Sequence, residues 1–273
     1  MNLKKIYSVI IGATLFGAMI SCQDLERPTL GDYPKDSNPV GGPLKFYTAF
    51  DGTSVDSIRA NFGNDKAVGY EAGVNGKAYF SKSAESYITY AAPNDFGKAT
   101  SMTISFWMKS KNPAKGIGAQ FVFALPESSH WSKSSAFMLF EDGNQSESGK
   151  IACKFMVLDQ WLEFVGDNRI PNILNDQWHH LALVYDEKTS VLSLYVDGVA
   201  QSRTLTLRKN NQPMGALDFN NTQKFIIGGP GHQALGATKD AWMINYQGGL
   251  DQFRLYGKAL TASEITALYN GKL

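Results

Sequence analysis

From residue 44 to residue 256 the chain is divided into short stretches in which apolar and polar side chains alternate. Met102–Met108 and Leu181–Tyr185 follow this pattern. Leu192–Val196 also follows it and is succeeded by Asp197-Gly198, a dipeptide typical of a two-residue β-hairpin turn. Helical periodicity is nearly absent. The sequence therefore predicts roughly ten to thirteen strands in one all-β sandwich or barrel.

One short helix is predicted near the C-terminus. Thr261 and Glu264 have the spacing of a capping box, in which each side chain binds a backbone amide of the first turn. Ile265 and Leu268 give the segment an apolar side. Gly271 is expected to end the helix in a left-handed conformation.

A series of segments in this order carries a resemblance to a known family: Phe50–Gly52, Gly76–Ala78, Thr103–Trp107, Asn175–Asp186, Leu192–Gly198, Gly248–Tyr256 and Leu260–Ile265. They resemble the opening strands, central hairpin, closing strand and final helix of laminin G-like domains in the concanavalin A-like superfamily. The resemblance covers residues 44–273 and implies an all-β, two-sheet antiparallel jelly-roll sandwich with one short C-terminal helix. It does not select a function, because this fold carries lectins, glycoside hydrolases, adhesion modules and structural spacers.

Residues 1–21 have the plan of a secretory signal peptide. Lys4 and Lys5 precede the apolar stretch Ile6–Ile20, which is shorter than the about 20 residues of a bilayer-spanning helix. Met19-Ile20-Ser21-Cys22 resembles the lipobox of bacterial lipoproteins, so Cys22 is expected to be lipidated. The alternative is an ordinary signal peptide or a short anchor.

Residues 22–43 are predicted to form a tether from lipidated Cys22, because they are rich in proline and glycine. The alternative is a loop packed along the domain surface. Asp24 and Glu26 resemble the acidic surface-export signal of some gram-negative lipoproteins. We therefore expect an outer membrane lipoprotein exposed at the cell surface, with the periplasmic face as the alternative.

Charge and cysteine content exclude several classes of protein. The formal net charge is +1 and no basic run follows the two N-terminal lysines, so nucleic-acid binding is not expected. Cys22 and Cys153 are too few for a disulfide framework or a cysteine-rich metal site. Cys153 lies in a predicted strand and is interpreted as a small buried apolar side chain.

No catalytic motif is found, so a non-catalytic protein is expected. Hydrolases of this superfamily carry Glu-x-Asp-x-x-Glu on one strand, which turns the carboxylates to one side of the sheet. No such run occurs here; Glu141, Asp186 and Asp197 stand beside turn residues and are interpreted as solvated loop charges. A carboxylate pair assembled from distant loops is the alternative. His179 and His180 would point to opposite faces of a strand and are interpreted as structural.

The resemblance also implies a calcium ion, which laminin G-like domains often hold through carboxylate and backbone carbonyl oxygens. Asp51 and Asp251 occupy the motif positions for such ligands, with Asp56 behind them. The alternative is that these side chains accept hydrogen bonds from backbone amides in turns.

Trp131, Trp161 and Trp242 are the candidates for carbohydrate binding, because their neighbours are polar or turn-forming. An exposed ring offers a flat apolar face to the C–H side of a sugar, and nearby amides bind hydroxyls. The neighbours expected to assist are His130, Asn245 and Tyr246. The alternative is that the rings pack against the ends of the sandwich.

Taken together, these features predict a non-catalytic surface lipoprotein that binds a polysaccharide or host glycan within a glycan-uptake system. Its partners would be the glycan, the membrane through Cys22, and other envelope proteins. Two alternatives are left open. One is a glycoside hydrolase with dispersed carboxylates, and the other is an adhesion or assembly module that binds protein.

Overall fold

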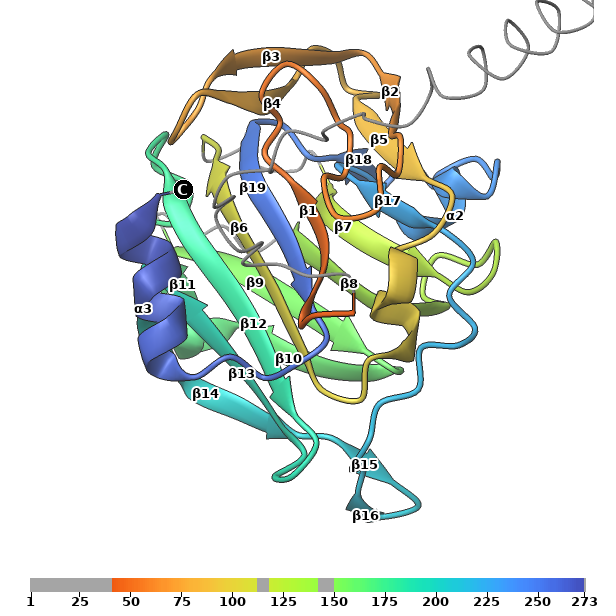
Figure 1. Cartoon of the computed structure of the whole chain (residues 1–273), viewed down its shortest axis with the longest axis vertical. Coiled ribbons are helices and arrows are strands. Elements are labelled where there is room, and N and C mark those ends of the chain that lie inside the picture. The colour runs from red at the N-terminus through yellow and green to blue at the C-terminus, as the bar shows by residue number, and fades with distance from the viewer. Residues whose placement is uncertain (1–40, 112–117, 142–149, 273) are drawn as a thin grey trace, which may run out of the picture. The chain divides into compact units, whose positions relative to one another are not determined.

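The computed structural model describes residues 41–111, 118–141 and 150–272 (Figure 1). The predicted signal peptide, Cys22 and nearly all of the predicted tether lie outside the described residues. None of the helices in the described ranges has the length and apolar character needed to cross a membrane.

The described chain forms two large antiparallel sheets, as the sequence predicts. The strands of the eight-stranded sheet are β1 (Leu44–Thr48), β3 (Val68–Ala72), β4 (Lys77–Ser81), β6 (Met102–Lys109), β12 (His179–Asp186), β13 (Val191–Val196), β14 (Val199–Thr206) and β19 (Gly249–Tyr256). Their order is β14-β13-β12-β6-β19-β4-β3, and β1 pairs with β19.

The strands of the nine-stranded sheet are β2 (Asn64–Lys66), β5 (Tyr87–Tyr90), β7 (Ala119–Pro126), β8 (Ser134–Glu141), β9 (Lys150–Val157), β10 (Gln160–Phe164), β11 (Ile170–Pro171), β17 (Phe225–Ile227) and β18 (Met243–Asn245). Their order is β10-β9-β8-β7-β17-β5-β2, with β11 beside β9. The ninth strand, β18, runs parallel to β7. The short strands β15 (Arg208–Lys209) and β16 (Gln212–Pro213) pair with each other.

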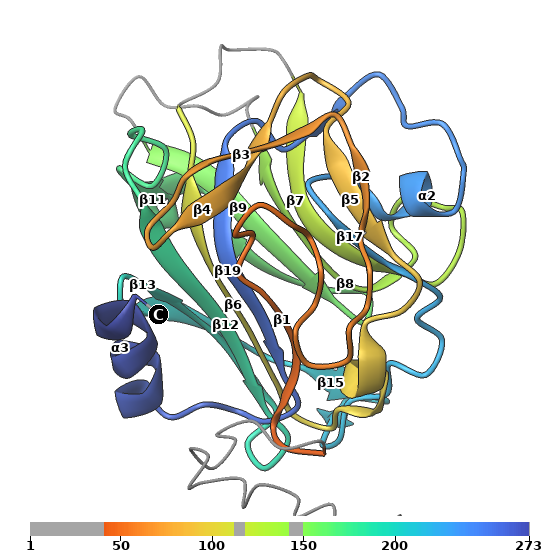
Figure 2. The same cartoon turned by 45° about the horizontal axis from the view of Figure 1, so that its top comes forward.

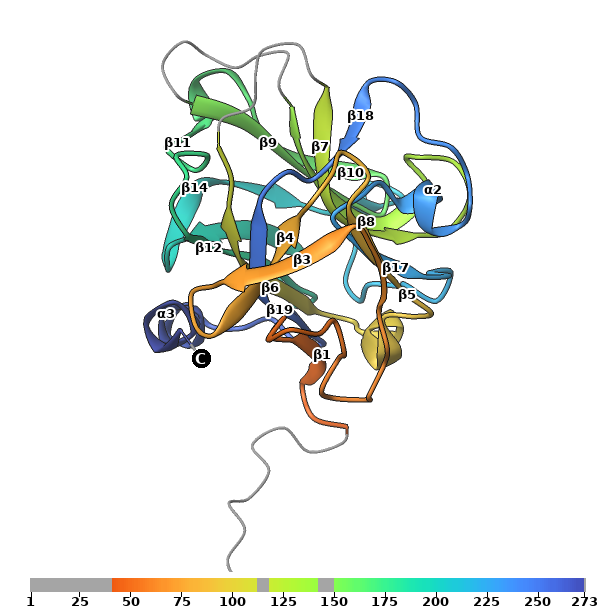
Figure 3. The ribbon, with the colours of Figure 1, turned by 90° about the horizontal axis from the view of Figure 1, so that it is seen from above.

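The inner faces of the two sheets meet in one aromatic core, and the sheets lie face to face in Figures 2 and 3. Phe106 stacks on Phe253 with ring centroids 5.0 Å apart, and both rings belong to the eight-stranded sheet. Phe123 and Phe225 of the nine-stranded sheet each approach Phe253 to 5.6 Å. The alternation read in Met102–Met108 is therefore confirmed, because its apolar face lies in this core.

The outer face of the eight-stranded sheet is covered by the helix α3 (Ala262–Gly271), which lies beside β12 in Figure 2. Both bonds of the predicted capping box between Thr261 and Glu264 form. The left-handed residue at the end is Lys272, with φ of 48°, one position beyond the predicted Gly271. Trp107 is 2% exposed because Tyr269 of α3 stacks on it at 5.5 Å.

The described residues form three further short helical segments, η1 (Asn94–Lys98), η2 (Gly166–Asn168) and α2 (Gly231–Ala234). The outer face of the nine-stranded sheet carries a second, smaller apolar cluster, to which Phe121, Phe137, Ile226 and Met243 belong. Ala234 of α2 packs on this cluster, and Trp131 and Trp161 pack at its border. Loops therefore cover part of this face and leave a hollow beside them.

Candidate functional site

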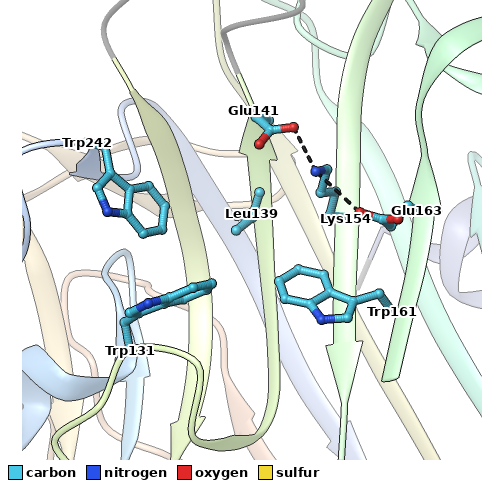
Figure 4. A pocket seen from close by; sticks show the side chains of 7 residues that line it. All are labelled: Trp131, Leu139, Glu141, Lys154, Trp161, Glu163 and Trp242. Atoms are coloured by element: carbon cyan, nitrogen blue, oxygen red, sulfur yellow. Dashed lines mark ion pairs between the residues drawn. The ribbon is translucent and has the colours of Figure 1, made fainter. Parts of the chain in front are cut away.

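The three tryptophans predicted to bind sugar converge on one pocket in the outer face of the nine-stranded sheet (Figure 4). Its volume is about 290 Å³. The lining residues are Trp131, Leu139, Glu141, Lys154, Trp161, Glu163 and Trp242. Small-molecule pockets usually span about 300 to 1,000 Å³, so this tryptophan pocket lies at the small end of that range.

Strand alternation supplies the floor and one wall of the tryptophan pocket. Leu139 of β8 lies opposite Lys154 of β9, which in turn lies opposite Glu163 of β10. Side chains opposite one another in antiparallel strands share one face of the sheet. Trp161 is two residues before Glu163 and therefore points to the same face. These four side chains form an apolar floor beside a charged wall.

Trp242 reaches the tryptophan pocket because its backbone is fixed to the start of β7. The amide of Ala119 donates to the Trp242 carbonyl at 2.8 Å, and β18 begins at the next residue. Gly118 has φ of 104°, and a Cβ there would lie 2.3 Å from the Trp242 carbonyl oxygen. This approach requires glycine. Trp242 is left 42% exposed.

Trp131 lies in the connection between β7 and β8 and packs against the other two tryptophans. Its ring centroid is 5.1 Å from that of Trp242, at 86°, and 6.4 Å from that of Trp161. Phe137 supports Trp131 and Trp161 from below, at 6.1 and 5.2 Å. The rings thus pack on the outer face of the sheet and also present surface to the pocket.

An ion triad forms the charged wall. The Lys154 ammonium lies 2.7 Å from Glu141 and 3.2 Å from Glu163, and Figure 4 shows it between the two carboxylates. Partial burial acts to lower the pKa of Lys154, but the two ion pairs outweigh it and raise this pKa above its usual value. Glu141 is not a solvated loop charge as its neighbours suggested, because it is the last residue of β8 and faces the pocket.

Sequence reasoning did not select the ion triad or Leu139 as site residues. A signal was present in the alternation of Phe137, Leu139 and Glu141 and of Lys154 and Met156 on adjacent strands. The sequence does not show that β8 pairs with β9, nor that this part of the outer face is left open.

The structure does not bring Asn245 and Tyr246 into the tryptophan pocket. Tyr246 is fully buried, and its hydroxyl donates to the Lys109 carbonyl at 3.1 Å. The buried Asn245 amide donates to Gln233 Oε1 at 2.9 Å and accepts from Lys239 at 2.7 Å. Asn245 is enclosed by Gln233 and Lys239, and Tyr246, which follows β18, lies in the core between the sheets, so neither offers a surface to a ligand in the pocket.

His130 is exposed and lies beside Trp131, with ring centroids 6.1 Å apart. Its Nδ1 is 3.0 Å from the Ser132 hydroxyl. It is outside the residues that line the tryptophan pocket. His130 therefore supports the loop that carries Trp131.

Two of the calcium candidates, Asp51 and Asp251, lie at the loop between β3 and β4. Asp51 accepts from the Lys77 amide at 2.6 Å, and Asp251 Oδ2 accepts from the Val74 amide at 2.7 Å. Burial raises the pKa of Asp251 to about 6, against the lowering effect of the Val74, Asn75 and Gln252 amides. Asp251 Oδ1 is buried without a hydrogen-bond partner in the described chain. Such an oxygen fits a hard cation, as does the proximity of Asp51.

Asp56 does not join them. It is fully buried and its carboxylate accepts from the amides of Tyr47, Ile58 and Arg59 and from the Asn94 side chain. The Asp56 carboxylate therefore holds the backbone of this turn in place. In the described residues, no group of three or more His, Cys, Asp or Glu side chains is arranged to hold a metal ion. A cation at Asp51 and Asp251 would therefore need backbone carbonyl ligands.

Comparisons with known proteins agree with this architecture. Residues 82–266 match a laminin G-type family described as the concanavalin A-like lectin/glucanases superfamily. The human neuronal pentraxin receptor is 22% identical over 169 residues, which cover 62% of this chain and 29% of that protein. The chain thus spans less than a third of that relative's length.

Two solved structures have a similar fold. Domain 4 of AbnA, an extracellular arabinanase from Geobacillus stearothermophilus solved with arabinotriose, has a TM-score of 0.54 at 19% identity, covering 83% of this chain and 98% of that chain. Botulinum neurotoxin type C, whose cell entry depends on interaction with two ganglioside molecules, has a TM-score of 0.56 at 10% identity, covering 84% and 51%. Given the family match over residues 82–266 and the two-sheet sandwich, this chain belongs to the concanavalin A-like lectin/glucanase superfamily.

Proposed function

We propose that this protein binds a glycan at the tryptophan pocket without cleaving it. The observation that carries the proposal is the convergence of Trp131, Trp161 and Trp242 on one hollow. Aromatic rings bind the apolar faces of sugars, and the carboxylates of Glu141 and Glu163 can accept hydrogen bonds from hydroxyls. Similar folds in an arabinotriose-bound domain and in a ganglioside-dependent toxin support a carbohydrate ligand.

Binding is best tested by retention of the purified protein in gels that contain single polysaccharides, followed by titration of the retained one. Trp242→Ala and Trp161→Ala are each expected to weaken binding by about tenfold or more, since a tryptophan at the centre of an interface often contributes about 2 kcal/mol. Phe62→Ala is the matched control, because Phe62 is 74% exposed and lies outside the pocket. Equal affinity of all four proteins would refute the proposed site.

A glycoside hydrolase is the second candidate, because two carboxylates lie in the tryptophan pocket. Retaining hydrolases hold two carboxyl groups about 5 to 5.5 Å apart on either side of the scissile bond. Here the Lys154 ammonium occupies the space between Glu141 and Glu163, within 3.2 Å of both. This arrangement favours binding over cleavage. Release of reducing ends that is lost in both Glu141→Gln and Glu163→Gln would establish the hydrolase instead.

The cellular role belongs to the same proposal. The lipobox at Cys22 and the acidic residues behind it support a lipid-anchored protein on the outer membrane, exposed at the cell surface, that captures glycan for an uptake system. A protein-binding adhesion module is the rival. Capture of an envelope protein that free glycan does not displace, by wild type and Trp242→Ala alike, would favour the rival.

We also propose that Asp51 and Asp251 hold a calcium ion with backbone carbonyls of the β3–β4 loop. The buried, unpartnered Asp251 Oδ1 supports this. The ion would neutralise a carboxylate that burial disfavours and would tie the last strand to the first part of the chain. In this role it is structural, since the tryptophan pocket is in the other sheet.

A further inference from the structure

Among the charged side chains that line the tryptophan pocket, the two glutamates are more exposed than the lysine between them. The side chains of Glu141 and Glu163 are 35% and 37% exposed, whereas that of Lys154, between them, is 18% exposed. Carboxylates accept hydrogen bonds and cannot donate them. A ligand therefore meets two acceptors before it reaches the single ammonium.

The charges of the pocket lining do not cancel. Among the seven described lining residues, two are acidic and one is basic, which leaves a formal charge of −1. The ammonium of Lys154 already pairs with both carboxylates. Lys133, in the loop that carries Trp131, pairs with Asp159 at 2.8 Å and lies outside the lining. No described lining residue thus has a positive charge to spare for an anionic ligand.

We infer that the tryptophan pocket selects uncharged glycans and discriminates against those with carboxylate or sulfate groups on the bound sugar. This inference rests on the proposed function and narrows its ligand class. Hydroxyls of a neutral sugar donate to Glu141 and Glu163 while its C–H face covers Leu139 and the tryptophan rings. An anionic sugar brings a like charge to this wall, and the negative faces of the rings repel it as well.

A cationic sugar is a poorer match than a neutral one. Rings and carboxylates together can attract an ammonium group. However, the position between Glu141 and Glu163, where such a group would gain most, is occupied by Lys154. An amino sugar would have to displace an internal ion pair or bind beside it.

The test uses matched polymers. A neutral 1,4-linked β-glucan and a galactomannan are each titrated before and after oxidation of their primary hydroxyls to carboxylates. For the polymer that binds, we expect the oxidised form to bind about tenfold more weakly at low ionic strength. The ratio of the affinities for the neutral and the oxidised form should shrink towards one at high salt, because about 1 M salt reduces the Debye length to about 3 Å.

Charge variants separate pocket electrostatics from a general effect of protein charge. Glu163→Gln should reduce the discrimination, and the double change Glu141→Gln with Glu163→Gln should reverse it, because Lys154 is then unpaired. Glu71→Gln is the matched control: Glu71 also pairs with a lysine, Lys82, and has a 51% exposed side chain, but it lies in β3 of the other sheet. It should leave the ratio unchanged.

Three results would overturn the inference. The first is oxidised polymer binding as tightly as neutral polymer, with Trp242 required for both; the proposed function then stands and only the selectivity is refuted. The second is a ratio that Glu163→Gln and Glu71→Gln change equally. The third is tighter binding of an aminated polymer than of its neutral parent. If no polymer of any pair is retained, the proposed function falls and the inference falls with it.

Discussion

Three neighbouring side chains in one row of the eight-stranded sheet each carry a buried polar atom that lacks a hydrogen-bond partner in the described chain. They are His180 Nδ1, Trp107 Nε1 and Asp251 Oδ1. His180 of β12 lies opposite Trp107 of β6, which lies opposite Asp251 of β19. Buried polar atoms of this kind are usually satisfied by ordered water or an ion. The stability of the fold should therefore depend on pH and on the calcium concentration.

The first prediction concerns pH. Burial, assisted by Arg254, lowers the pKa of His180 to about 4, against the raising effect of Asp197. A histidine whose pKa is lower in the folded state stabilises the fold above its unfolded pKa of about 6.5, and this contribution is lost as pH falls through about 4. We expect the melting temperature of wild type to fall more steeply than that of His180→Gln between pH 6.5 and pH 4.

The control for this experiment is internal. Asp251, whose pKa is raised to about 6, acts in the opposite direction, but it is common to both proteins and cancels in their difference. Both proteins are measured with a chelator present. Parallel pH profiles would mean that His180 has an ordinary pKa in the fold.

The second prediction concerns calcium. Because its folded pKa is raised, ionised Asp251 destabilises the fold as pH rises from about 4 to about 6, by on the order of 2 to 3 kcal/mol. A cation that binds only the folded protein reverses this loss. A ligand at a hundred times its Kd stabilises by about 2.7 kcal/mol, which corresponds to a rise in Tm of several degrees.

We therefore expect millimolar calcium to raise the Tm of wild type at pH 7 over that in chelator, and to leave Asp251→Asn unchanged. In chelator, Asp251→Asn should be at least as stable as wild type, because it removes a buried charge. Asp186→Asn, at the end of β12, is the control and should keep the calcium response. An equal response of all three proteins would place the ion elsewhere.

At the scale of elements, helix α3 depends on its N-terminal cap. The Glu264 amide donates to the Thr261 hydroxyl, and the Glu264 carboxylate accepts from the Thr261 amide at 2.7 Å. Thr261→Ala should lower the free energy of unfolding by about 1 kcal/mol in urea titrations. Glu264→Gln should cost less, because glutamine also closes a capping box. A larger effect of Glu264→Gln would mean that the ion pair with Lys258 stabilises the helix more than the cap does.

The elements differ in how far the sequence predicts them. Alternation in Met102–Met108 identifies the core face of β6, and the turn signal at Asp197 identifies the β13–β14 hairpin. Both are local patterns. The first follows from the two-residue period of a strand, and the second from the positive φ that the turn requires at Asp197 and Gly198. The parallel strand β18 could not be predicted in this way, because its three residues adopt strand structure only by pairing with β7.

The same distinction explains the site. Trp131, Trp161 and Trp242 were selected one by one from polar surroundings, yet their convergence depends on sheet order and on the approach of Gly118 to Trp242. Asn245 and Tyr246 were selected because they are near Trp242 in sequence. The first is enclosed by polar side chains, and the second lies in the core between the sheets. Closeness in sequence is therefore a poor guide to closeness in a site built from loops.

At the scale of the whole molecule, the sequence predicts a lipid anchor that precedes the described domain. We expect wild type produced in a gram-negative host to incorporate a labelled fatty acid and to sediment with membranes. Cys22→Ser should lose both properties, because acyl chains supply about 0.8 kcal/mol of membrane affinity per buried methylene. Cys153→Ala is the control, since Cys153 is fully buried and should not affect labelling. If Cys22→Ser keeps its full length and still sediments with membranes, the N-terminal segment holds the protein as an uncleaved anchor. Intact cells that carry wild type should bind the glycan, and cells that carry Trp242→Ala should not. This result would show that the anchored protein presents the tryptophan pocket at the cell surface.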